Sequence, residues 1–182
     1  MTASPPNVRA TTTEHEKGEN GMHTRQHLGT VAAATLLLLA TASGAKAGQK
    51  VTGSGQAFRV PKSSETYKLS DGRSVQQTSE AGYLTAAQSD NPLNMNSQDC
   101  SGTVIVSTDG KTSTGGGYCV GFDPSGDTAW IWWHGGFDGG TWGFMDGTGK
   151  FKGVDGGGTW KTKQRLPDGK FIDTWEGTWQ MK

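Results

Sequence analysis

The chain has 182 residues, enough for one domain with additional segments, and its 17 Lys and Arg residues balance 17 Asp and Glu residues. This neutral balance argues against a nucleic-acid groove or a polybasic membrane contact. No apolar run reaches the roughly 18 residues that a membrane-spanning helix needs. Glycine is abundant, with 29 residues, and hydrophobic residues make up only 32%.

Residues 22–47 have the three parts of a secretory signal. Arg25 lies in a basic start, residues 31–40 are apolar, and Ala45-Lys46-Ala47 forms an A-x-A cleavage site before Gly48. We therefore expect a periplasmic or secreted protein whose single domain is residues 48–182. Residues 1–21 are polar, and we expect either an extension ahead of a true start at Met22 or a disordered segment.

Two cysteines, Cys100 and Cys119, lie in the predicted exported part. An even count in an exported chain favours a disulfide, and no C-x-x-C spacing suggests a redox pair. Asp109-Gly110 is typical of a two-residue hairpin turn. Continuing the pairing outward from this turn places Cys100 opposite Cys119, with Cα atoms about 5 Å apart. A bulge in the glycine run 115–117 would shift this register by one residue.

The predicted domain is all-β, because turn residues separate short strand-like runs and no helical periodicity is present. We expect about eight to ten antiparallel strands in sequence order. Closure into an up-and-down β-barrel of about eight strands removes exposed edges, and a β-sandwich is the alternative. The clearest strand-like runs are residues 103–107, 118–122, 127–134, 141–145, 150–153, 158–163 and 170–180, with further strands at 58–60, 65–69, 74–77 and 81–86 and a loop at 89–96.

Aromatic residues gather in the last third of the chain, where all seven tryptophans lie between residues 130 and 179. The tripeptide Gly-Thr-Trp recurs at 140–142, 158–160 and 177–179, about one hairpin apart. Turn positions predict that Phe144 faces Phe151 and that Trp160 faces Trp175. Such cross-strand pairs stabilise a sheet by a few tenths to about 1 kcal/mol each.

Residue alternation predicts which side chains of two strands point inward. In the last strand, Asp173, Trp175 and Trp179 share an apolar face, so Asp173 is expected to be a buried acid that needs partners. For Asp173 itself, a rim position or a hydrogen-bonded structural role is the favoured interpretation. Strand 127–134 is apolar on both faces. We expect Trp130, Trp132 and His134 to line the lumen, and the Ala129, Ile131 and Trp133 face to pack on a layer, a loop or another subunit.

The segment 147–160, with the sequence GTGKFKGVDGGGTW, resembles the G-x-G-x-F-x-G hairpin of allene-oxide-cyclase-like and dirigent-like β-barrels. The resemblance implies an eight-stranded barrel, often trimeric, with an apolar cavity. Members of that superfamily guide the cyclisation or coupling of reactive hydrophobic molecules, largely by shape. The polar catalytic positions of those proteins do not align with this chain, so the resemblance assigns no catalytic residue.

Composition also limits the chemistry. His134 is the only histidine after residue 47, and with two paired cysteines it leaves too few ligands for a zinc site. No nucleophile elbow or phosphate-binding loop is present. We therefore expect no metal and no cofactor.

Three functions remain. The first is an exported barrel that binds a small hydrophobic or aromatic molecule in a Trp-rich cavity. The second is a cyclase or isomerase using the same cavity. The third is a carbohydrate-binding module with tryptophan platforms. The pattern does not decide between a binding protein and an enzyme, and tryptophans that serve only the core are a further alternative.

The predicted inward faces of strand 127–134 and of the last strand supply the candidate residues for these functions. The candidate catalytic residues are His134 and Asp173. The expected partner is a small hydrophobic or aromatic molecule, with a homo-oligomer of the chain as a further option, and we expect no nucleic acid and no membrane span. The candidate ligand-binding residues are Trp130, Trp132, His134, Trp175 and Trp179.

Overall fold

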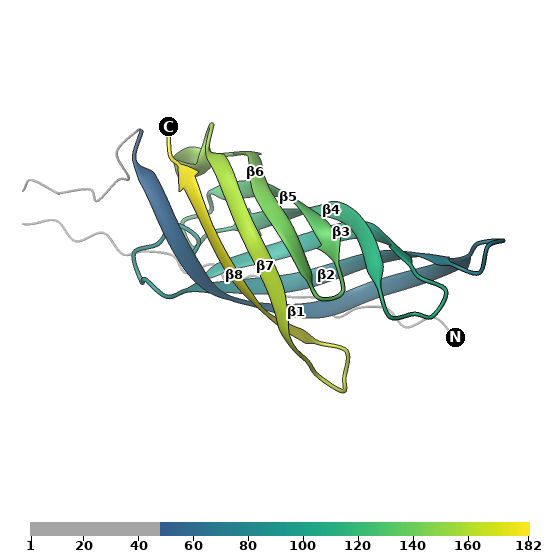
Figure 1. The fold of residues 1–182 in the computed structure, drawn as a ribbon. Coiled ribbons are helices and arrows are strands. Elements are labelled where there is room, and N and C mark those ends of the chain that lie inside the picture. The colour runs from purple at the N-terminus through teal and green to yellow at the C-terminus, as the bar shows by residue number, and fades with distance from the viewer. Residues whose placement is uncertain (1–47) are drawn as a thin grey trace, which may run out of the picture. The chain divides into compact units, whose positions relative to one another are not determined.

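The computed structural model describes residues 48–182, so the predicted signal at 22–47 and the extension at 1–21 lie outside the described residues. Eight antiparallel strands follow one another in sequence order, and β8 pairs back to β1 to close a barrel (Figure 1). This closure confirms the predicted barrel over the sandwich. The elements are β1 Lys50–Lys68, β2 Ser74–Ala86, β3 Asn96–Val106, β4 Ser113–Phe122, β5 Thr128–Gly136, β6 Gly139–Gly147, the 3-10 turn η1 Gly149–Phe151, β7 Asp155–Arg165 and β8 Phe171–Gln180.

The first two strands are longer than the short runs expected from the sequence. Residues 58–60 and 65–69 belong largely to the single strand β1, in which an irregularity between Pro61 and Ser63 interrupts the pairing with β2. β1 pairs with β8 only as far as Arg59. Beyond that point β1 pairs only with β2, which is itself paired with β3 as far as the residue next to the β1–β2 turn (Figure 1).

The strand predicted at 150–153 is wrong, because the segment begins with η1 instead. Phe151 is fully buried and stacks on Phe144 with the ring centroids 6.2 Å apart. The predicted contact between these two rings therefore forms, but through a tight turn rather than across a hairpin. Burial of the Phe151 ring outweighs the strand preference of this short segment.

The disulfide between Cys100 and Cys119 is confirmed. The two residues are direct partners in the β3–β4 register, and their Cα atoms lie 4.0 Å apart. The glycine run at 115–117 continues the ladder without a bulge. Both cysteines are buried and line the barrel interior, so the disulfide joins the two strands from the inside.

The two ends of the barrel differ. At the end that carries the chain segments next to β1 and β8, here called the terminal end, Leu93, Phe151, Val154 and Met181 are almost completely buried and fill the lumen. The opposite end, here called the hairpin end, carries the β1–β2, β3–β4, β5–β6 and β7–β8 turns. Among the described residues, no helix is long and apolar enough to span a bilayer.

Edge-to-face aromatic contacts form the centre of the core. The Trp142 ring lies 5.6 Å from Phe144, 6.3 Å from Trp175 and 6.1 Å from Trp179, measured between centroids. The Trp142 Nε1–H donates to the Thr159 carbonyl, and the Trp175 Nε1–H donates to the Gln56 carbonyl. These hydrogen bonds let two indole groups enter an apolar core without leaving a donor unpaired.

Glycine makes room for tryptophan on the inner wall. The Trp133 indole, from β5, lies across Gly102 of β3 and Gly117 of β4, where a Cβ atom on either glycine would overlap the ring. A side chain at these positions would occupy the volume that Trp133 fills. Part of the high glycine content is therefore explained by large rings packed flat against neighbouring strands.

The substitution Gly102→Ala is expected to lower the free energy of unfolding by about 1–3 kcal/mol, because Trp133 must shift toward the lumen. Urea unfolding followed by far-UV circular dichroism measures this change. The matched control is Gly121→Ala on β4, where the nearest atom to an added Cβ lies 3.7 Å away and no significant loss is expected. Equal stability of the two variants would contradict the packing role of Gly102.

Candidate functional site

The lumen contains an inner chamber with a cavity volume of about 80 Å³. Trp160 and Trp175 are direct cross-strand partners and both line it, which confirms the predicted pairing. The remaining apolar wall comes from five strands and from the loop between β2 and β3. Its members are Ala57, Leu84, Leu93, Cys119, Ile131 and Trp142.

A second chamber, with a cavity volume of about 160 Å³, lies toward the hairpin end and is here called the outer chamber. It contains more polar groups, including Gln76, Thr78 and Ser113. The two chambers share four lining residues, Arg59, Cys100, Trp133 and Trp160. The lumen therefore narrows at these side chains, between an apolar interior and a more polar mouth.

The prediction for strand β5 is wrong about which face lines the lumen. Trp130 and Trp132 are 45% and 41% exposed and lie on the outer face together with the exposed His134. The inner face carries Ile131 and Trp133, both of which line the inner chamber. The glycines of β3 and β4 decide this orientation, because only they leave room for an inward Trp133 ring.

The prediction for the last strand is confirmed. Asp173, Trp175 and Trp179 are all buried, and Asp173 and Trp175 line the inner chamber. Trp179 is packed in the core, against Trp142 and Phe144. Trp175 is thus the one candidate ligand-binding residue of the five that lines a lumen chamber. The binding and catalytic roles assigned from the sequence remain predictions.

A cluster of charged residues crosses the lumen at its narrow point. Arg59 of β1 contacts Asp173 of β8 through Nε and Oδ2 at 2.6 Å, and Glu80 of β2 through Nη1 and Oε2 at 3.0 Å. Its guanidinium also lies over the rings of Trp160 and Phe171, 5.0 and 5.6 Å from their centroids. Burial raises the pKa of Asp173 above the ordinary aspartate value, although Arg59 acts in the opposite direction.

Several buried polar atoms at the narrow point have no hydrogen-bond partner among residues 48–182. Among them are the Nε1 atoms of Trp133 and Trp160 and the Oδ1 atom of Asp173. All three residues line the inner chamber. An unpaired buried donor or acceptor costs about 1–3 kcal/mol, so these atoms favour a polar group placed between them.

Three residues of this site were not among the candidates chosen from the sequence, namely Arg59, Trp133 and Trp160. Arg59 lies in a segment with irregular alternation, where the inward face is hard to recognise. Trp133 was assigned to the opposite face. The sequence does indicate the position of Trp160, because this residue belongs to a Gly-Thr-Trp copy and the turn positions predict that it faces Trp175.

The outer face of β4 and β5 carries its own aromatic residues. Tyr118 lies directly opposite Trp132 in the register and is 58% exposed, and Trp130 follows two residues away on the same face. The Trp132 indole occupies the space above Gly143 of β6. A carbohydrate platform requires aromatic side chains placed outward in this way, and so does a contact with a further copy of the chain. Both roles remain predictions.

Among the described residues, no group of three or more His, Cys, Asp or Glu side chains is arranged to hold a metal ion. One acidic side chain, Asp123, receives hydrogen bonds from Ser125 and the Asp127 backbone and pairs with the Lys150 ammonium. This group therefore stabilises the β4–β5 loop through contacts within the protein.

No family model and no curated protein matches the chain. Among solved structures, it is similar to the pterocarpan synthase dirigent protein GePTS1, with 16% identity and a TM-score of 0.48, over 83% of this chain and all of the other. It is also similar to the pterocarpan synthase dirigent protein PsPTS1, with 13% identity and a TM-score of 0.45, over 73% of this chain and 96% of the other.

Proposed function

We propose that the barrel binds a small hydrophobic or aromatic molecule in its lumen. Ligand sites in proteins are mostly apolar pockets with a few convergent polar groups that fix orientation. The inner chamber has this composition, with indole and aliphatic walls and one charged cluster on one side. Its volume of about 80 Å³ suits at most a single aromatic ring, and the 160 Å³ of the outer chamber beyond it leaves room for the rest of the ligand.

The observation that carries this proposal is the set of unpaired polar atoms at the narrow point. The Trp133 and Trp160 N–H groups are donors without acceptors, and the Asp173 Oδ1 atom is an acceptor without a donor among the described residues. A ligand with a carbonyl or ether oxygen beside its ring would accept from the indoles while its apolar body fills the inner chamber. Trp142 and Trp175, by contrast, are already satisfied by backbone carbonyls.

Benzamide is a suitable probe, because it combines a single planar ring with a carbonyl acceptor. We expect one molecule to bind per chain by titration calorimetry. The variants Trp133→Phe and Trp160→Phe keep a ring but remove a donor, and each should weaken binding about tenfold. Trp130→Phe on the outer face is the matched control and should bind as the unmodified protein does. Lack of binding, or binding insensitive to both inner variants, would contradict the proposal.

A cyclase or isomerase acting in the same chamber is the second candidate. Asp173 favours it, since a buried carboxyl group with a raised pKa that faces an apolar chamber suits proton transfer. Native mass spectrometry of protein purified from its own source would identify a retained molecule. An enzyme would convert that molecule or its precursor, and Asp173→Asn would bind it without conversion. His134, on the outer face, is not suited to this role.

We also propose that the protein acts outside the cytoplasm, in the periplasm or in the medium. The signal pattern at 22–47 and the Cys100–Cys119 disulfide both support export.

A further inference from the structure

We propose that Arg165, at the mouth of the lumen, recognises an anionic group on the ligand. This inference rests on the proposed lumen function and narrows its ligand class. The ligand would be a small amphiphilic acid, with its apolar body in the inner chamber and a carboxylate or a similar anion in the outer chamber.

The position of Arg165 supports this assignment. Arg165 ends β7 at the hairpin end and lines the outer chamber. Its guanidinium lies between two aromatic rings, 5.3 Å from the centroid of Phe137 and 4.9 Å from that of Phe171. Stacking between rings holds the planar group in one orientation and leaves its N–H edge available for an acceptor.

Arg165 forms no ion pair within the described chain, and the buried carboxylate on which its charge acts, Asp173, is already paired with Arg59. The other two arginines there each have a carboxylate partner, since Arg59 pairs with Asp173 and Glu80, and Arg73 pairs with Asp71. Arg165 has none among residues 48–182, and the acceptor of its Nη2 is the Phe137 carbonyl oxygen. A guanidinium has five N–H donors in a fork that matches a carboxylate, so most of its hydrogen-bonding capacity remains for a ligand.

A purely structural role explains Arg165 less well. Its contact with Phe137 ties the β5–β6 turn to β7, but two other hydrogen bonds already do so. The Thr162 hydroxyl donates to the same Phe137 carbonyl, and the Thr162 N–H donates to the Asp138 carbonyl. The turn therefore keeps its attachment without Arg165, and we expect substitutions of Arg165 to fold.

Two probes of the same shape isolate the charge. Benzoate is anionic, and benzamide is its neutral counterpart. By titration calorimetry, the unmodified protein should bind the carboxylate about tenfold more tightly than the carboxamide, with a preference that decreases as salt is added. Arg165→Gln should lose this preference and bind the carboxamide unchanged. Arg165→Lys, which retains a positive charge, should retain part of it.

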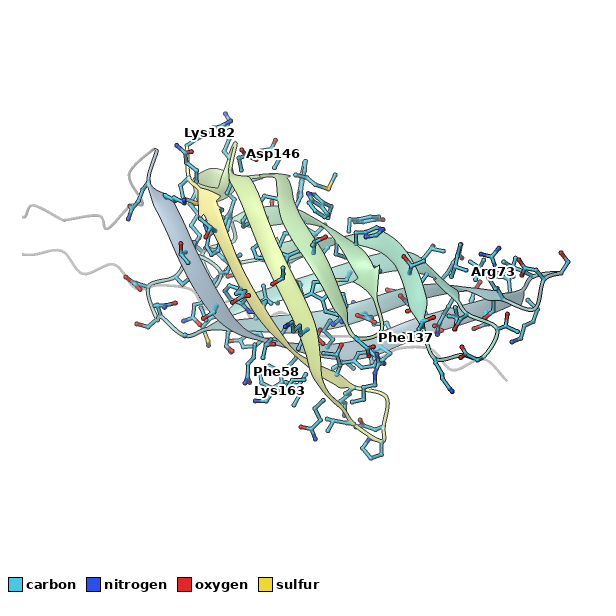
Figure 2. All side chains as sticks on the ribbon, viewed as in Figure 1. Phe58, Arg73, Phe137, Asp146, Lys163 and Lys182 are labelled. Atoms are coloured by element: carbon cyan, nitrogen blue, oxygen red, sulfur yellow. A yellow bond between two sulfur atoms is a disulfide. The ribbon has the colours of Figure 1, made fainter. Side chains whose placement is uncertain are left out.

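Lys163→Gln is the matched control, because it removes the same charge from the same strand. Lys163 lies at the β7 irregularity between Thr162 and Gln164, lines neither chamber, and in the view of Figure 2 is on the other side of β7 from Phe137. It should bind both probes as the unmodified protein does. Thermal unfolding of each variant establishes that it is folded.

The outcomes separate the two proposals. If both probes bind equally well to the unmodified protein, or if Arg165→Gln weakens both alike, the role of Arg165 is contradicted and lumen binding stands. If neither probe binds to the folded protein, the proposed lumen function itself fails.

Discussion

Replacing Trp142 with alanine is expected to lower the free energy of unfolding by about 4 kcal/mol, the upper part of the range for large aromatic residues in cores. Trp142 is buried and contacts Phe144, Trp175 and Trp179 within 6.3 Å between ring centroids. The change also leaves the Thr159 carbonyl without its indole donor. Urea unfolding followed by far-UV circular dichroism measures the loss independently of tryptophan emission.

Trp130→Ala is the matched control for this prediction. Trp130 belongs to the same barrel but is 45% exposed on the outer face, so its truncation is expected to cost much less, about 1 kcal/mol or below. Similar losses in the two variants would mean that the aromatic cluster around Trp142 does not dominate the stability of the core.

Replacing Arg59 with methionine is expected to lower the free energy of unfolding by about 3 kcal/mol at neutral pH. Arg59 is the common partner of Asp173 and Glu80, and its removal leaves a buried carboxylate facing the lumen without a cation. The variant also loses the cation–π contacts with Trp160 and Phe171. In the double variant Arg59→Met, Asp173→Leu, much of the stability should return, because no unpaired charge of this pair remains.

The cost of Arg59→Met should depend on pH. Burial already raises the pKa of Asp173 above the ordinary aspartate value, and loss of the adjacent guanidinium raises it further. An aspartate with a raised folded-state pKa contributes stability that is fully present below the unfolded pKa and is lost as the pH rises through the folded-state pKa. The stability that Arg59→Met loses relative to the unmodified protein should therefore be smaller near pH 4 than near pH 7.

A surface ion pair provides the control for this second prediction. Arg73→Met removes the partner of Asp71 in the exposed β1–β2 hairpin, where both side chains are about half exposed. No measurable change in stability is expected at either pH, because water already solvates the remaining charge. A deficit in Arg59→Met that is independent of pH would contradict the assignment of its cost to the unpaired Asp173.

Local signals in the sequence were sufficient for the disulfide and for several pairings. The Asp109-Gly110 turn sets the β3–β4 register, and every residue outward from a tight hairpin follows from that turn. Cys100 and Cys119 could therefore be paired by position alone, and the Trp160–Trp175 pair followed in the same way. The inward face of β8 was also predictable, since only one of its faces is apolar.

The inward face of strand β5, by contrast, could not be predicted from local patterns in the sequence. Both of its faces are apolar, so alternation alone does not select the inner one. The selection depends on Gly102 and Gly117, which belong to strands β3 and β4 and leave space for Trp133. Which glycine lies opposite which tryptophan is a long-range property. The site residue Arg59 was likewise recognisable only once β8 had been placed beside β1.

The sequence by itself determined that the protein is an all-β barrel built from tight hairpins and joined by one disulfide, because turn residues and alternation act over a few neighbouring residues. Only the tertiary structure decided what the lumen contains. Closure of β8 onto β1 brings Arg59 to Asp173, while the glycines of β3 and β4 turn Trp133 inward and leave Trp130 and Trp132 outside. These placements depend on steric fit and charge pairing between strands that are distant in the chain.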